Sequence, residues 1–157
     1  MKRIIISVTS DLTGDNRVHK VATRLRGMGF SVLLAGRRLK SSDPALHRQY
    51  PCIRMHLLFR KGAGFYAEYN FRLLCYLLFH RFDLLLSNDL DTLPANFIAA
   101  KIKGKPLVYD SHEYFSEVPE LIGRDAVRSV WLWIERKIIP GVDAAYTVSR
   151  SIAGEYT

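Results

Sequence analysis

The stretch that decides the fold is residues 83–111, which read DLLLSNDLDTLPANFIAAKIKGKPLVYDS. Its apolar run at Asp83–Ser87 predicts a strand buried on both faces. Asp91 stands where a helix N-cap belongs, and Gly104 stands where that helix would stop. The apolar run resumes at Leu107–Asp110, which predicts a second strand. A strand, a helix and a strand within about 30 residues form a βαβ unit, so the two strands should be parallel.

The same alternation continues in both directions along the chain. Further strands are expected at Arg3–Ser7, Ser31–Ala35, Ile53–Leu57 and Ala144–Val148, with a polar loop at 40–51; helices are expected from a cap at Asp15 or Asn16 to Met28, at Phe65–Phe79, at Arg124–Ile139 and beyond Ser149. This pattern predicts an α/β fold, a doubly wound parallel sheet of order 3-2-1-4-5-6 in a Rossmann-like three-layer sandwich. Ligands of such sheets lie beyond the carboxyl ends of the strands, where the strand order reverses.

The composition indicates one globular domain with a basic surface. The 157 residues include 23 Lys and Arg against 15 Asp and Glu, a formal net charge of +8. Positive charge favours anionic partners, here phosphorylated ligands or an anionic membrane, although ordinary solvated surface gives the same count. Zinc-finger spacing, an RNP-like strand and a basic tail are all missing from the sequence, so no nucleic-acid partner is expected.

The sequence also predicts a cytoplasmic location, with peripheral contact at the inner face of the membrane. Cys52 and Cys75 are in no paired motif, which favours a reducing compartment. The apolar run Ile4–Val8 is too short for a signal peptide, and Leu73–Phe79 is far shorter than the roughly 20 residues of a membrane-spanning helix.

The first candidate site is the loop Thr9–Arg17, which leads into a helix N-terminus where free N–H groups favour an anion. Gly14 is its sole glycine, so the loop matches neither the dinucleotide fingerprint nor the P-loop. Arg17 places a positive charge in the first turn of the predicted helix, where the helix dipole disfavours it, and this suggests an anionic partner. The alternative is that Asp15 and Asn16 serve only as turn and cap residues.

The second candidate is Asn88–Asp91, whose carboxylates Asp89 and Asp91 are two residues apart, as in the D-x-D metal motif of some sugar transferases. The preferred interpretation is that Asp91 caps the following helix and Asp89 shapes the turn. We therefore expect no metal at this position.

The third candidate is the polar run Asp110–Tyr114, directly after a predicted strand at the ligand edge. Ser111, His112 and Glu113 point in different directions along the chain and cannot form a triad among themselves. His112 is suited to a phosphate or a sugar hydroxyl, and the carboxylates can accept hydrogen bonds from hydroxyls. The alternative is that these side chains satisfy the loop's own backbone.

Two of the predicted helices carry apolar and aromatic residues that either cover the core or form an exposed surface. The aromatic and basic residues of 62–81 fit either an interfacial helix or, preferably, a helix that covers the core. On the last long helix we expect the row Val127, Val130, Trp131, Ile134 and Ile138 to face the core, which leaves Trp133 partly exposed.

Taken together, six segments resemble the N-terminal half of the retaining glycosyltransferases of family 4, which have the GT-B fold. The segments are Asp15–Val18, Arg24–Val32, Asn88–Pro94, Leu107–Glu113, Val118–Leu121 and Thr147–Ala153. They cover almost the whole chain in the expected order.

The resemblance implies an acceptor-binding domain of a two-domain enzyme that moves a sugar from a nucleotide-sugar to a glycan or lipid-linked acceptor, as in cell-surface polysaccharide synthesis. His112 would lie near the transferred sugar and act in catalysis. Substrate binding would fall to Gly14, Asp15, Asn16, Arg17, Asp89, Asp110, Ser111 and Glu113. The donor would bind mainly to a second domain, which residues 1–157 do not contain, so the chain alone should be inactive. No cofactor besides the nucleotide-sugar substrate is implied.

Two other classes of function are open. One is a non-enzymatic α/β domain that binds a ligand or a partner. The other is a nucleotide-dependent enzyme of Rossmann type, which the missing glycine fingerprint disfavours.

Overall fold

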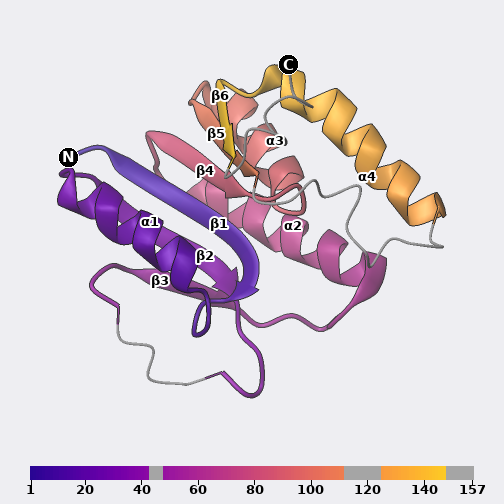
Figure 1. The fold of residues 1–157 in the computed structure, drawn as a ribbon, viewed down its shortest axis with the longest axis horizontal. Helices are drawn as coiled ribbons and strands as arrows, with labels where there is room; N and C mark the ends of the chain where they lie inside the picture. Colours follow the sequence, from indigo (N-terminus) through magenta and orange to yellow (C-terminus); the bar gives the residue numbers. More distant parts are fainter. Residues whose placement is uncertain (43–47, 112–124, 148–157) are drawn as a thin grey trace.

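The computed structural model describes residues 1–42, 48–111 and 125–147, and these form one six-stranded parallel sheet with helices on both faces (Figure 1). The strands are β1 (Arg3–Asp11), β2 (Ser31–Arg37), β3 (Cys52–Met55), β4 (Leu84–Asn88), β5 (Leu107–Ser111) and β6 (Ala144–Thr147). The helices are α1 (Asn16–Gly27), α2 (Gly62–Phe79), α3 (Leu93–Lys103), α4 (Asp125–Ile138) and the 3-10 helix η3 (Ile139–Gly141). The strand order is β3-β2-β1-β4-β5-β6, which confirms the predicted doubly wound fold.

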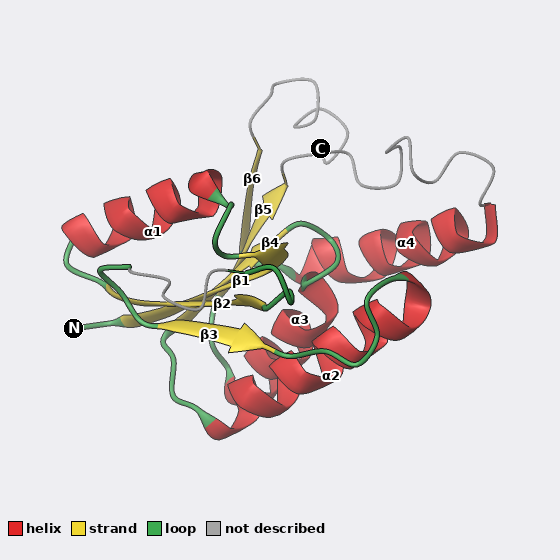
Figure 2. Cartoon of the chain, turned by 90° about the horizontal axis from the view of Figure 1, so that it is seen from below, coloured by secondary structure: helices red, strands yellow, loops and turns green. Residues whose placement is uncertain are grey.

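The central strands are buried on both faces, as their unbroken apolar runs predicted. Ile5 of β1 packs in the core formed with α2, α3 and α4, whereas Ile4 and Ile6 pack in the core under α1. Figure 2 shows the same division, with α1 on one side of the sheet and α2, α3 and α4 on the opposite side. Successive side chains of a strand point to opposite faces, so a run of isoleucines fills both cores.

The edge strand β6 departs from this expectation. The sequence predicts that the inward-facing residues of all six strands are almost fully buried, yet Ala144, Ala145 and Tyr146 of β6 are exposed, Tyr146 by 42%. The prediction was wrong because β6 is at the sheet edge, where it pairs with β5 on one side. An apolar run predicts a strand, but its burial depends on what lies beside it.

The ends of the helices test the caps that were predicted from the sequence. Asp15 is the N-cap of α1 and accepts a hydrogen bond from the Val18 backbone N–H at 3.0 Å. Gly104 ends α3 in the left-handed conformation at φ 59°, as predicted. The predicted cap of α3 was wrong, because Thr92 is at the cap position and the Asp91 carboxylate binds the Thr9 hydroxyl instead.

Helix α2 covers the core, as the preferred interpretation held. Its Phe65, Tyr69, Leu73 and Leu77 are buried at four-residue spacing, and the Tyr69 hydroxyl donates to the Val8 carbonyl at 2.6 Å. None of the helices within the described ranges is long and apolar enough to cross a lipid bilayer.

Helix α4 is rotated relative to the prediction. Trp133 is 61% exposed, as expected, but Val127 and Val130 are exposed as well and do not face the core. The reason is that α4 packs through Trp131, whose ring meets the Tyr66 ring edge-on with centroids 5.0 Å apart. That contact turns the row of Val127 and Val130 toward solvent.

Candidate functional site

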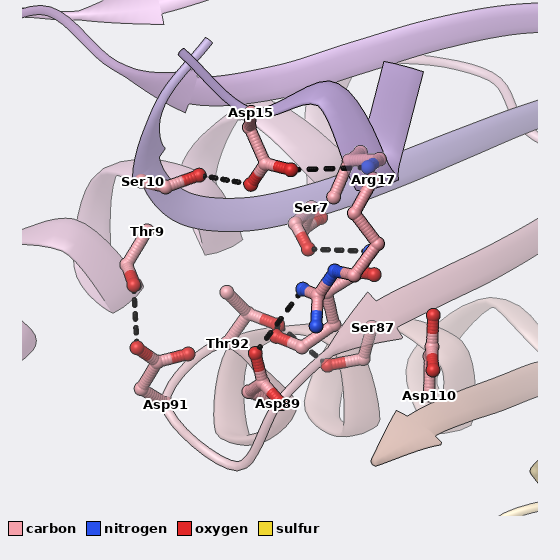
Figure 3. A network of polar contacts seen from close by, with 12 residues as sticks. Ser7, Thr9, Ser10, Asp15, Arg17, Ser87, Asp89, Asp91, Thr92 and Asp110 are labelled. Atoms are coloured by element: carbon pink, nitrogen blue, oxygen red, sulfur yellow. Dashed lines mark hydrogen bonds and ion pairs between the residues drawn. The ribbon is translucent and has the colours of Figure 1, made fainter. Parts of the chain in front are cut away.

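The candidate site lies at the carboxyl edge of the sheet, where the strand order reverses between β1 and β4. The connection from β1 to α1 meets the connection from β4 to α3 and the end of β5 at this edge (Figure 3). The Asp89 backbone N–H donates to the Asp110 carbonyl at 2.9 Å, which ties the last two of these segments together. The sheet topology therefore gathers the predicted site residues that the structure describes.

The connection between β1 and α1 is fixed by Asp15. One of its carboxylate oxygens accepts from the Val18 backbone N–H, and the other accepts from the Ser10 hydroxyl at 2.6 Å. Asn16 and Gly14 are exposed, and a Cβ built on Gly14 would meet no atom within 4 Å. This leaves open space for a ligand beside the first turn of α1.

Arg17 has an anionic partner within the chain. Its Nη2 lies 3.5 Å from Oδ2 of Asp89, on the connection that follows β4. The sequence suggested an anionic partner for Arg17; Asp89 provides a negative charge within the chain, and binding of an anionic ligand stays a prediction. Both side chains stay partly exposed, at 39% and 23%, so they can still reach a ligand.

Asp89 shapes the turn after β4, as predicted. Its backbone φ is 59°, in the left-handed region that residues other than glycine rarely adopt. Asparagine and aspartate tolerate that region best, because their short polar side chains can bond locally. The strained backbone aims the Asp89 carboxylate at Arg17 across the gap between the two loops (Figure 3).

Asp91 is buried and bonds to a different partner from Asp89. Its Oδ2 accepts a hydrogen bond of 2.5 Å from the Thr9 hydroxyl, which joins the ends of β1 and β4. Burial raises the pKa of Asp91 to about 7; the Thr9 hydrogen bond opposes this rise, and the negative charge of Asp89 adds to it. The carboxylates of the D-x-D pair are thus engaged with different partners, Arg17 and Thr9.

Asp110 is fully buried at the end of β5. Its Oδ2 accepts a hydrogen bond of 2.6 Å from the Tyr146 hydroxyl of β6. Burial raises the pKa of Asp110 to about 6, while the Tyr146 hydrogen bond and the positive charge of Arg17 oppose that rise. Ser111 follows and is buried too; His112 and Glu113 lie outside the described residues.

A set of buried and half-buried polar side chains behind the site was not predicted from the sequence. The Ser87 hydroxyl is 2.7 Å from the Thr92 hydroxyl, which itself donates to the Asn88 carbonyl at 2.9 Å. Asn70 of α2 donates to the Asp91 carbonyl at 2.8 Å and accepts from the Ala95 backbone N–H at 3.1 Å. These bonds hold the β4–α3 connection in place. The sequence could have indicated Asn70, because it is an asparagine within a mostly apolar helix.

The arrangement suits a ligand rich in hydroxyl groups. Carboxylate oxygens such as those of Asp89 accept hydrogen bonds from hydroxyls, and the Arg17 guanidinium can donate to a phosphate or a carboxylate. Asp91 and Asp110 both carry pKa values raised by burial, and can therefore exist in protonated form near neutral pH.

A family model covers most of this chain. The family model of Glycosyltransferase Family 4 matches residues 15–157. Comparison with curated protein sequences gives no match.

Solved structures share the fold at low sequence identity. Sucrose-phosphate synthase from Thermosynechococcus elongatus superposes with a TM-score of 0.74 and 15% identity, over 98% of this chain and 44% of that one. MurG of Acinetobacter baumannii gives a TM-score of 0.58 and 11% identity, over 95% and 42%. The S. aureus MnaA–UDP structure gives 0.59 and 15%, over 99% and 40%. The chain spans less than half the length of these three proteins.

Proposed function

Since this chain belongs to Glycosyltransferase Family 4 and has the Rossmann-like fold of GT-B enzymes, we propose that it is the acceptor-binding half of a sugar-transferring enzyme. In this proposal a nucleotide-sugar is the donor and is bound mainly by a second domain. The family membership favours this function over a non-enzymatic binding domain.

One observation carries the proposal, which is the Arg17–Asp89 pair at the reversal point of the sheet. The pair bridges two loops, is partly exposed, and lies next to the open first turn of α1. Asp89 would accept hydrogen bonds from acceptor hydroxyls, and Arg17 would face a phosphate. Glycosyl transfer needs both, because the hydroxyl must be held in line and the leaving diphosphate must be stabilised by positive charge.

We further propose that Gly14, Asp15, Asn16, Asp110, Ser111 and Glu113 take part in substrate binding and that His112 acts in catalysis. The acceptor would be a glycan or a lipid-linked molecule of cell-surface polysaccharide synthesis. The enzyme would work in the cytoplasm, in peripheral contact with the anionic inner face of the membrane. The net charge of +8 supports this location, and so do the two free cysteines.

The test has one arm on this chain and one on the two-domain enzyme. Calorimetry of the 157-residue chain with UDP-glucose and GDP-mannose should show no tight binding, and a submicromolar constant would refute the half-enzyme proposal. In the two-domain enzyme, His112→Ala should lower turnover by about a hundredfold or more, because a lost transition-state contact costs several kcal/mol. His80→Ala, an exposed histidine at the opposite edge, is the control and should keep normal turnover. A His112→Ala enzyme with a normal rate per folded molecule would make that residue structural.

A further inference from the structure

Most of the net positive charge of the chain comes from one short stretch of sequence. Residues 37–61 hold seven of the 23 Lys and Arg but one of the 15 Asp and Glu, which is a net charge of +6 in 25 residues. Residues 62–157 hold ten Lys and Arg against twelve Asp and Glu, so their own net charge is −2. The stretch 37–61 runs from the end of β2 through β3 to the start of α2.

Two arginines at the end of β2 contact the connection and the helix that follow β3 (Figure 2). The Arg37 guanidinium lies 4.9 Å from the centroid of the Phe65 ring, near the start of α2. The Arg38 backbone N–H donates to the Met55 carbonyl at 2.9 Å, and its Nη1 donates to Nε2 of His56 at 3.2 Å. A histidine nitrogen that accepts from arginine belongs to a neutral ring, so these contacts leave both positive charges in place.

These two arginines have no negatively charged partner in the part of the chain that the structure describes. The ion pairs formed between described residues involve neither Arg37 nor Arg38. Arg37 is half-buried, and its Nε is buried without a hydrogen-bond acceptor among those residues. Burial removes water that would stabilise the guanidinium charge, so a half-buried cation without a counter-ion costs free energy. A bound anion would offset that cost.

The start of α2 adds further positive charge at the same edge of the sheet. Arg60 and Lys61 come directly before the helix and are exposed. The first turn of α2 has no acidic residue, although the start of a helix favours negative charge. The one acidic residue of α2, Glu68, pairs with Arg72 at 2.8 Å. We name the four cations without a described acidic partner the β2–α2 cluster: Arg37, Arg38, Arg60 and Lys61.

Helix α1 is basic too, but its charges have a local explanation. Arg24 and Arg26 are in its last turn, where cations complement the negative end of the helix dipole. Arg26 also donates to the Gln49 carbonyl. The β2–α2 cluster has the opposite placement, at the start of a helix and at the carboxyl ends of strands, which is the edge where ligands of doubly wound sheets bind.

We propose that the β2–α2 cluster is a phosphate-binding subsite, and that the acceptor of the proposed reaction carries a phosphate or diphosphate group. Guanidinium groups suit phosphate because two N–H groups can donate to two of its oxygens. Strand β1 lies between β2 and β4, with Asp11 in register with Arg37. The cluster is therefore two strand spacings, roughly 10 Å, from the β4 end that carries Asp89, a length that a phosphorylated sugar can span. Assignment of the phosphate to the acceptor rests on the proposed function.

Calorimetry of the 157-residue chain with inorganic pyrophosphate tests the subsite in the absence of donor and acceptor. Pyrophosphate should bind with a Kd below about 1 mM at low ionic strength, and added sodium chloride should weaken the binding. Titrations with glucose 6-phosphate and geranyl diphosphate then distinguish two sources of the phosphate. Tighter binding of the first would support a soluble sugar phosphate, and tighter binding of the second would support a diphosphate on an apolar chain.

Matched variants test whether the binding belongs to the β2–α2 cluster. Arg37→Gln should weaken pyrophosphate binding about tenfold, because a hydrogen bond to a charged group is lost. Arg24→Gln removes the same charge from the exposed side of α1 and should leave the binding unchanged. Circular dichroism checks folding. Lys61→Gln changes an exposed side chain of the cluster and should weaken binding about threefold, with Lys20→Gln as its control.

Three results would overturn the proposal. The first is failure of pyrophosphate to bind below 1 mM, and the second is an equal loss of binding in the α1 variants and the cluster variants, which would show attraction by net charge alone. The third is tight binding of a short oligonucleotide that Arg37→Gln abolishes, which would assign the cluster to nucleic acid. Failure of sugar transfer in the turnover measurements would remove the acceptor but leave pyrophosphate binding in place, so the two failures are distinguishable.

Discussion

Asp91→Asn should flatten the pH dependence of the chain's stability. The Asp91 carboxyl has an ordinary pKa of 3.8, and burial raises it to about 7 in the folded chain. Between these two values the folded chain holds a proton that the unfolded chain has released. The free energy of unfolding therefore falls as the pH rises from about 4, and this loss is complete above about pH 7.

The size of the effect follows from the same two values. A tenfold change in acidity corresponds to about 1.4 kcal/mol, so a rise from 3.8 to about 7 corresponds to about 4 kcal/mol once the carboxyl is fully ionised. Asparagine has the same shape, can still accept the Thr9 hydrogen bond and does not ionise. At pH 8 the variant should therefore be more stable than the parent chain by up to about 4 kcal/mol, whereas at pH 4 it should have no such advantage.

Urea unfolding followed by circular dichroism at a series of pH values measures this difference. Asp125→Asn, which changes an exposed carboxylate on α4, is the matched control and should leave the pH dependence as it is. The Asp91→Asn curve should keep a smaller slope from Asp110, whose pKa is raised to about 6. Parallel curves for the parent chain and Asp91→Asn would refute the reasoning.

Two further predictions concern local packing and capping. Trp133→Ser should leave the melting temperature of the chain nearly unchanged, because Trp133 is 61% exposed. Trp131→Ser should lower the free energy of unfolding by about 3–5 kcal/mol, because Trp131 is 7% exposed. Similar losses of stability in the two variants would contradict this prediction. Asp15→Ala should destabilise the chain by about 1–2 kcal/mol through loss of the N-cap bond to Val18. Asn16→Ala, at an exposed position that supplies no cap, is its control in thermal unfolding, and an equal effect of both changes would disprove the capping role.

The sequence by itself determined the elements of this protein and their arrangement. Near-continuous apolar runs require strands buried on both faces, and parallel strands require helical crossovers, so the strand order followed from local patterns and general rules of topology. Asp15 and Gly104 were read correctly because a helix cap depends on residues within one turn. The family resemblance likewise rests on short local segments, and the match to residues 15–157 confirms it.

The tertiary structure alone decided what the polar side chains do. The position of Asp91 in the sequence predicts a helix cap, but its hydrogen-bond partner Thr9 is 82 residues away in the chain. The partner of Arg17 is Asp89, which is 72 residues away. The rotation of α4 depends on the contact between Trp131 and Tyr66 of α2, which turned Val127 and Val130 outward. A polar side chain bonds to groups that lie close to it in space, and only the packed sheet brings those groups within bonding distance. The raised pKa values of Asp91 and Asp110 have the same origin, since burial is a property of the assembled fold.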